Sequence, residues 1–139
     1  EVDVYDRLVD IQGTGVPRLF GHGLLVADDT PYAVLVMELV VDCIEPTVDE
    51  DRNLAILHQC PLATRQAALA LLDDIHRRGA CHGDARAHNI LFEQHPNRKD
   101  ALHPRIIDFS LGMVDPNADD IRHDRDHWSE VLGLDNAHH

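Results

Sequence analysis

The most informative stretch of the sequence is His82-Gly83-Asp84-Ala85-Arg86-Ala87-His88-Asn89. In it a histidine, an aspartate and an asparagine follow the pattern H-x-D-x-x-x-x-N, between a helix-forming segment and a short apolar run. A second acid, Asp108, follows the run 105–107 and precedes Phe109. These two segments predict one polar site that is assembled from two loops.

The residue types in these loops are those that phosphoryl transfer requires. An acid must accept or orient the proton of the attacking hydroxyl, oxygen ligands must hold magnesium, and a cation must offset the charge of the transferred group. Asp84 suits the first role and Arg86 the third. Asn89 and Asp108 carry the oxygen atoms that a hard cation such as Mg²⁺ prefers. The spacing therefore predicts a phosphotransferase site.

The periodicity of apolar residues around this site predicts a mixed fold. Residues 62–78 have an apolar stripe at helical spacing, and Gly79 follows as a helix cap. Residues 28–31 are expected to form a turn between two strands, and 95–103 a loop. We predict helices at 1–11, 62–78 and 128–134, a short helix within the acidic segment 41–61, and strands at 18–27, 32–37, 89–92 and 105–108. This order favours an α+β domain with antiparallel pairing.

Composition narrows the classes of partner. The chain has 25 acidic and 12 basic residues, and its net charge of -13 argues against binding to nucleic acid or to an anionic membrane surface. No segment is long and apolar enough to span a membrane, and no secretory leader is visible, so we expect an intracellular location, cytoplasmic or nuclear. Cys43, Cys60 and Cys81 are odd in number and widely spaced, which predicts free thiols.

At these motifs the sequence resembles the eukaryotic-type protein kinase superfamily. His82 to Asn89 is similar to its catalytic loop, and Asp108-Phe109-Ser110 is similar to its metal-binding Asp-Phe-Gly. Residues 34–40 resemble the strand and hinge that contact adenine, and the overall wording is most similar to small fungal kinase-like proteins. The resemblance covers about residues 1–114.

The resemblance implies ATP and Mg²⁺ as ligands and a role for each matching residue. Asp84 would be the catalytic base and Arg86 the cation beside the phosphate, while Asn89 and Asp108 would bind magnesium. His82 and Phe109 would have structural roles at the site. The residues implied in nucleotide binding are Met37 as gatekeeper, the backbones of Glu38 and Val40 at adenine, and Glu1 on the regulatory helix.

Departures from the kinase pattern leave several functions open. The chain has no lysine before Lys99 and no glycine-rich phosphate loop before Glu1, so we expect a truncated kinase-like fold, possessing part of the N-lobe at 1–37, the hinge and linker at 38–61, and the C-lobe core at 62–139. The leading function is phosphorylation of protein Ser/Thr, with a protein substrate as partner. The alternatives are a small-molecule kinase of the aminoglycoside or choline kinase type, with which His82-Gly83-Asp84 is shared, and an impaired pseudokinase or interaction module.

Overall fold

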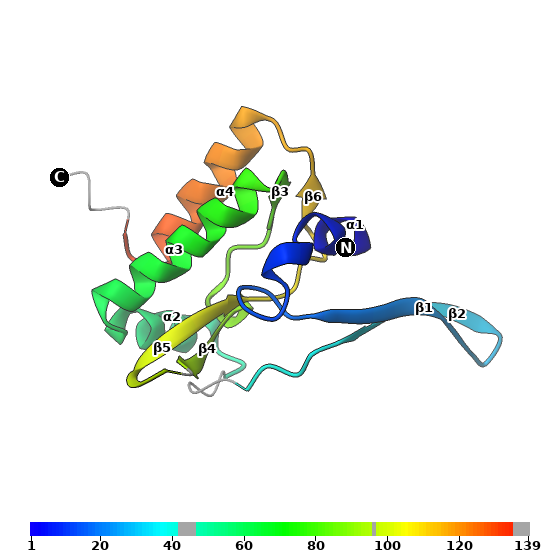
Figure 1. Ribbon diagram of the computed structural model, residues 1–139, viewed down its shortest axis with the longest axis horizontal. Helices are drawn as coiled ribbons and strands as arrows, with labels where there is room; N and C mark the ends of the chain where they lie inside the picture. The colour runs from blue at the N-terminus through cyan, green and yellow to red at the C-terminus, as the bar shows by residue number, and fades with distance from the viewer. Residues whose placement is uncertain (42–46, 96, 135–139) are drawn as a thin grey trace.

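The computed structural model describes residues 1–41, 47–95 and 97–134, which form a mixed α+β fold (Figure 1). The expected fold class is therefore confirmed. In chain order the elements are α1 (Val2–Arg7), the 3-10 helix η1 (Val9–Ile11), β1 (Leu19–Ala27), β2 (Thr30–Met37), α2 (Glu50–Gln59), α3 (Leu62–Arg77), β3 (Ala80–Cys81), the 3-10 helix η2 (Ala87–Asn89), β4 (Ile90–His95), β5 (Arg98–Ile106), β6 (Met113–Val114) and α4 (Ala118–Val131). The strands pair antiparallel as β1–β2, β3–β6 and β4–β5.

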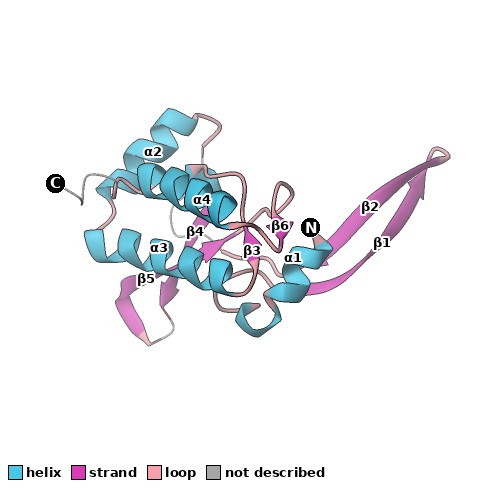
Figure 2. Cartoon of the chain, turned by 90° about the horizontal axis from the view of Figure 1, so that it is seen from above, coloured by secondary structure: helices cyan, strands magenta, loops and turns pink. Residues whose placement is uncertain are grey.

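Helix α3 is the central element of the core. Its predicted apolar stripe is buried at Ala68, Leu72 and Ile75, and the helix packs beside α4 in both views (Figure 1, Figure 2). Gly79 ends the helix with a φ of +81°, a conformation that favours glycine, and its N–H donates to the His76 carbonyl. The cap predicted from sequence is therefore confirmed, and it directs the chain into β3 and the catalytic loop.

The β1–β2 hairpin extends away from the helices (Figure 1, Figure 2). Ala27 pairs with Thr30, so the turn contains only Asp28 and Asp29, at φ of +50° and +61°. The hairpin expected at 28–31 is confirmed, but its turn is shorter than that segment, because two residues with positive φ suffice to match the twist of a hairpin and aspartate tolerates that region. The large apolar side chains of the hairpin strands are exposed at Phe20, Leu24, Leu25, Val26, Tyr32, Val34 and Val36.

The β4–β5 hairpin is longer than the apolar runs indicated. Phe92 pairs with Pro104, and the pairing continues through polar residues to His95 opposite Arg98. The loop expected at 95–103 is therefore wrong. Strand pairing requires only backbone hydrogen bonds, so a strand can continue through residues that lack the apolar pattern. This hairpin leads the chain from the catalytic loop, through β4 and β5, to Asp108.

Helix α4 begins well before the expected residue 128. Asn117 caps it reciprocally with Asp120: Asn117 Oδ1 accepts from the Asp120 N–H at 2.8 Å, and Asp120 Oδ2 accepts from the Asn117 N–H at 3.0 Å. We had taken the charged segment 115–127 as non-helical because its exposed face dominates the composition. The helix buries Asp124 and Trp128 against the catalytic loop.

Two further expectations concern thiols and membranes. Cys60 and Cys81 are buried thiols outside any disulfide, and Cys43 lies outside the described residues. In the part of the chain that the structure describes, no helix is both long and apolar enough to cross a membrane.

Candidate active site

His82 connects the catalytic loop to the strand before Asp108. Its ring is fully buried, with its centroid 4.9 Å from that of Phe109 and 5.1 Å from that of Trp128. Nε2 lies 2.7 Å from the Ile107 carbonyl, and Nδ1 accepts from the Asp84 N–H at 3.1 Å. These partners assign the proton to Nε2, and burial lowers the pKa of the imidazole, so the ring is neutral. In this arrangement His82 positions Asp84 and takes no proton from substrate.

The carboxylate of Asp84 is positioned by two neighbours on its own loop. Arg86 Nε lies 3.0 Å from Asp84 Oδ1, and Asn89 Nδ2 donates to Asp84 O at 3.0 Å and to Asp84 Oδ2 at 3.3 Å. Asn89 is buried, which fixes its amide, whereas the side chain of Arg86 is 60% exposed. The structure thus brings together three of the residues that the motif singled out.

Asp108 lies on a strained turn next to this cluster. Its φ is +61°, and its Oδ1 accepts from Ser110 Oγ at 2.6 Å and from the Ser110 N–H at 3.2 Å. The hydroxyl hydrogen bond lowers the pKa of the Asp108 carboxyl, so the group is ionised at neutral pH. The adjacent Ile107 N–H donates to the Asn89 carbonyl at 2.9 Å, which connects the two predicted metal-binding loops.

A cavity of about 370 Å³ lies between the hinge and Asp108. The four residues expected at the nucleotide, Glu1, Met37, Glu38 and Val40, all line it. The remaining lining residues are Pro17, Leu39, Leu91, Ile107 and Asp108. The apolar side chains among them can enclose a flat ring, and Asp108 adds a carboxylate to the lining. We call this space the nucleotide cavity.

Phe109 anchors the second loop to the core. Its side chain is fully buried and its ring centroid lies 5.5 Å from that of Tyr5 on α1 and 4.9 Å from that of His82. Both contacts are edge-to-face, a geometry that favours aromatic pairs. The position of Asp108 therefore depends on the packing of α1.

Arg105 is a buried cation that sequence reasoning missed. Its Nη2 lies 2.5 Å from Glu38 Oε1, and its Nη1 donates to Glu93 Oε1 at 3.2 Å and to the Gly13 carbonyl at 2.7 Å. Burial opposes ionisation of Glu38, but hydrogen bonds from the Arg18 N–H and Arg105 hold its pKa below the usual range. Arg105 fastens the hinge to β5, which fixes one wall of the nucleotide cavity.

Asp124 is the second residue that sequence reasoning missed. It lies in a charged segment with Asp115, Asp119, Asp120 and Asp126, which is the pattern of a solvated face, but its side chain is 5% exposed. Its Oδ2 accepts from His76 Nε2 at 2.8 Å and from the His82 N–H at 2.9 Å, and its Oδ1 accepts from the Gly83 N–H at 3.0 Å. The carboxylate thus fastens α4 and α3 to the catalytic loop.

Gly83 is required by the shape of this loop. Its φ is +84°, and a Cβ at this position would collide with the carbonyl oxygen of Leu111. The structure thus gives a steric reason for glycine at this position.

We expect acid to destabilise the fold through His82 and Asp124. The pKa of His82 is lower in the folded than in the unfolded chain, so its contribution is complete above about pH 6.5 and is lost as the pH falls. Burial would raise the pKa of Asp124, but hydrogen bonds from His76, His82 N and Gly83 N lower it, so this contribution persists above about pH 3.9 and is lost below that. Each pKa unit of difference is worth about 1.4 kcal/mol.

Urea denaturation from neutral to acid pH measures this effect. A His82→Gln variant, whose side chain does not titrate, is the control and should show a smaller decrease in unfolding free energy between about pH 7 and pH 5. Equal decreases in the two proteins would show that His82 is not a source of the acid sensitivity.

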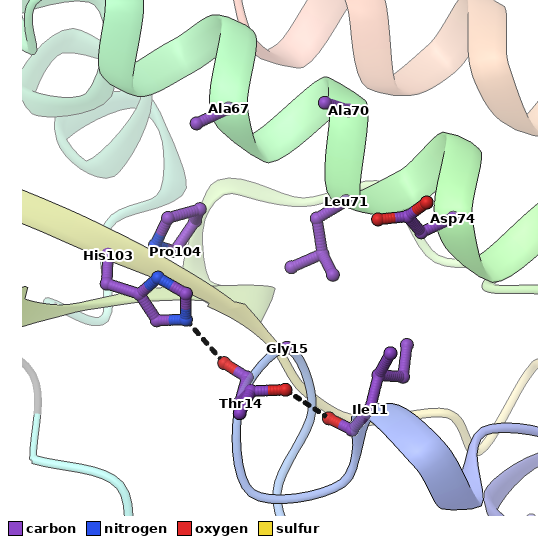
Figure 3. A pocket seen from close by; sticks show the side chains of 9 residues that line it. All are labelled: Ile11, Thr14, Gly15, Ala67, Ala70, Leu71, Asp74, His103 and Pro104. Carbon is purple, nitrogen blue, oxygen red and sulfur yellow. Dashed lines mark hydrogen bonds between the residues drawn. The ribbon is translucent and has the colours of Figure 1, made fainter.

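A separate hollow of about 300 Å³ lies between α3, β5 and the loop after η1 (Figure 3). Ala67, Ala70 and Leu71 of α3 form one wall, and His103 Nε2 lies 2.5 Å from the Thr14 carbonyl on the other side. The hollow shares no lining residue with the nucleotide cavity. Its walls are largely apolar, and its two titratable side chains, Asp74 and His103, lie apart from the cluster of Asp84 and Asn89, which is not part of the lining.

The residues of the site fit a magnesium ion that also binds phosphate oxygens. Among the described residues, no group of three or more His, Cys, Asp or Glu side chains can hold a metal ion by itself. Asn89 and Asp108 offer oxygen atoms from two loops, which suits Mg²⁺ because this ion is commonly held by few protein ligands together with substrate phosphates and water.

Residues 1–124 match the model of the lipopolysaccharide kinase (Kdo/WaaP) family. A comparison with curated proteins gives no match. The matched family belongs to the protein-kinase-like superfamily, so the resemblance read from the catalytic loop is confirmed at that level. The match supports the functions of kinase and transferase and the use of ATP, and it favours a sugar or small-molecule acceptor over protein Ser/Thr.

Proposed function

Because the chain belongs to the lipopolysaccharide kinase (Kdo/WaaP) family, we propose that it transfers the γ-phosphate of ATP to a hydroxyl group of a sugar or another small molecule. The observation that carries the proposal is the cluster of Asp84, Arg86 and Asn89, which lies next to Asp108 and the nucleotide cavity. Mg-ATP, when bound, supplies the phosphoryl group and part of the positive charge that transfer requires.

The residues of the chain would then divide the work as follows. The Asp84 carboxylate would accept the proton of the acceptor hydroxyl as the hydroxyl oxygen attacks the γ-phosphorus, while the bond from that phosphorus to the bridging oxygen breaks and ADP leaves. Arg86, which lies 3.0 Å from Asp84 and is 60% exposed, can turn toward the transferred group and offset its charge. Asn89 and Asp108 would hold magnesium through their side-chain oxygens. The backbones of Glu38 and Val40 in the hinge would orient the adenine ring.

The first test is a calorimetric titration with Mg-ATP. The described lining of the nucleotide cavity contains three acids, Glu1, Glu38 and Asp108, and no basic side chain. The net charge of -13 also opposes a polyanion. We therefore expect a dissociation constant of about 0.1–1 mM that depends on magnesium. Asp108→Asn should weaken binding in magnesium but change it little in excess chelator.

The second test follows phosphorylated product by mass spectrometry. D-Glucose, choline and a serine-containing peptide represent the sugar, small-alcohol and protein classes of acceptor. We expect product with the sugar or the alcohol. Product with the peptide alone would restore the protein kinase hypothesis, and magnesium-dependent ATP binding without any product would support the pseudokinase.

A further inference from the structure

A second cavity, of about 530 Å³, adjoins the nucleotide cavity. Leu91 and Ile107 line both cavities, so the two are neighbours across these side chains. The remaining walls come from the residues before and at the start of α2, Thr47, Val48 and Glu50, and from Arg86 and His88 of the catalytic loop. This volume falls within the range of about 300–1,000 Å³ that small-molecule sites occupy.

Glu50 and His88 form a fixed polar pair in this cavity. Glu50 Oε2 lies 2.8 Å from His88 Nδ1, and Glu50 Oε1 accepts from the Ala87 N–H at 2.5 Å. Partial burial alone would raise the pKa of Glu50, but the hydrogen bonds from His88 and Ala87 hold it below its usual range. The side chains of Glu50 and His88 are 36% and 39% exposed, so both can still meet a ligand.

The entry to α2 is held rigidly beside this pair. Asn53 Oδ1 accepts from the Thr47 N–H at 2.9 Å and from Thr47 Oγ1 at 3.0 Å, while Asn53 Nδ2 donates to the Thr47 carbonyl at 2.9 Å. Asn53 is buried, so its hydrogen bonds to Thr47 fix the first turn of α2. This turn carries Glu50, whose position relative to the catalytic loop is therefore fixed as well. The pair is therefore pre-organised and loses little freedom when a ligand binds.

The chemistry of the walls indicates the kind of ligand. Each basic side chain has a carboxylate partner within hydrogen-bond distance: Arg86 has Asp84 at 3.0 Å, and His88 has Glu50 at 2.8 Å. The described lining thus presents donors and acceptors without an excess of positive charge. Leu91, Ile107 and Val48 add an apolar surface of the kind that the C–H groups of a sugar ring can contact.

From this arrangement we infer that the cavity binds the hydroxyl-bearing acceptor of the proposed reaction, and that the Glu50–His88 pair selects an uncharged polyhydroxylated molecule. The inference rests on the proposed function, because the proposed phosphoryl transfer requires such an acceptor. Because Arg86 lines the cavity and is paired with Asp84, an acceptor here would have a hydroxyl close to the catalytic carboxylate. Glu50 would accept from one hydroxyl of the acceptor and His88 Nε2 would contact another.

Binding is measured first, by ligand-observed NMR with D-glucose and its carboxylate analogue D-glucuronate, which differ in a single group. We expect glucose to bind the wild-type chain and glucuronate to bind more weakly. Glu50→Gln, which retains the shape of the side chain, and His88→Ala should each weaken glucose binding by about ten- to hundredfold. Asp51→Asn, an exposed neighbour on the same helix turn, is the matched control and should leave binding unchanged.

Steady-state kinetics distinguish a loss of acceptor binding from a loss of folded protein. In phosphoryl transfer to glucose, Glu50→Gln should raise KM for glucose while kcat and KM for ATP stay within about threefold. Failure of glucose to bind, tighter binding of glucuronate, or unchanged glucose affinity in both variants would overturn the inference. Glucose binding that depends on Glu50 without phosphate transfer would support the site and contradict the proposed function.

Discussion

Replacing Asp84 by asparagine is expected to lower the rate of phosphoryl transfer by about 10²–10⁴-fold. The amide retains the size of the carboxylate and can still accept from Asn89 Nδ2, but it cannot take the proton of the acceptor hydroxyl. Because the change leaves the nucleotide cavity untouched, KM for ATP should change little. Initial rates of ADP formation with the acceptor that gives product measure the effect.

Asp119→Asn is the matched control for this experiment. Asp119 is exposed on α4 and is paired only with Arg122 among the contacts described for it, so its loss should leave the rate within about twofold. Circular dichroism and the thermal midpoint establish that both variants are folded. A rate for Asp84→Asn close to that of the control would remove Asp84 from the role of base.

Replacing Asp124 by alanine should destabilise the fold by about 3–5 kcal/mol. The change removes the acceptor of the His82 and Gly83 N–H groups and leaves His76 without its carboxylate partner at a buried position. Urea denaturation measures the loss, and activity should fall with it because the same N–H groups position the catalytic loop.

Asp126→Ala tests whether the effect is specific. Asp126 lies two residues along α4 and is exposed, so its removal should cost less than about 0.5 kcal/mol. The loss of unfolding free energy for Asp124→Asn, which retains one acceptor oxygen, should lie between the losses for the two alanine variants. Equal losses for the two alanine variants would show that the buried network is not what stabilises the loop.

The catalytic loop could be predicted from sequence because its parts are close along the chain. Asp84, Arg86 and Asn89 contact one another within six residues, so their spacing alone indicates their geometry. The cap at Gly79 was predictable for the same reason, since a helix end is determined by local backbone conformation. Local spacing therefore carried the part of the site where the chemistry is proposed.

The long-range contacts could not be predicted in this way. Arg105 contacts the Gly13 carbonyl, 92 residues away, and Asp124 contacts His82 N, 42 residues away. The neighbouring sequence does not identify the distant partner of either charge. In α4 the other acids concealed Asp124, although Trp128, one helical turn later, indicated a buried face.

The acceptor class could not be decided from the motif, for a different reason. The pattern of His82, Asp84 and Asn89 serves proton transfer and metal binding, which are common to kinases of proteins and of small molecules. Acceptor choice depends on walls supplied by other segments, which in the proposed acceptor cavity would include Glu50 of α2, whose position relative to His88 follows from the fold. A catalytic motif therefore predicts the reaction better than it predicts the molecule on which the reaction acts.

The edge-to-face contact between His82 and Trp128 gives the protein an optical property. Trp128 is the single tryptophan of the chain, its side chain is 1% exposed, and its ring centroid lies 5.1 Å from that of His82. Indole emission shifts with the polarity around the ring and is quenched by a nearby protonated imidazole. The intrinsic fluorescence of the unlabelled protein therefore reports directly on the state of the catalytic loop, from a residue that no ligand has to touch.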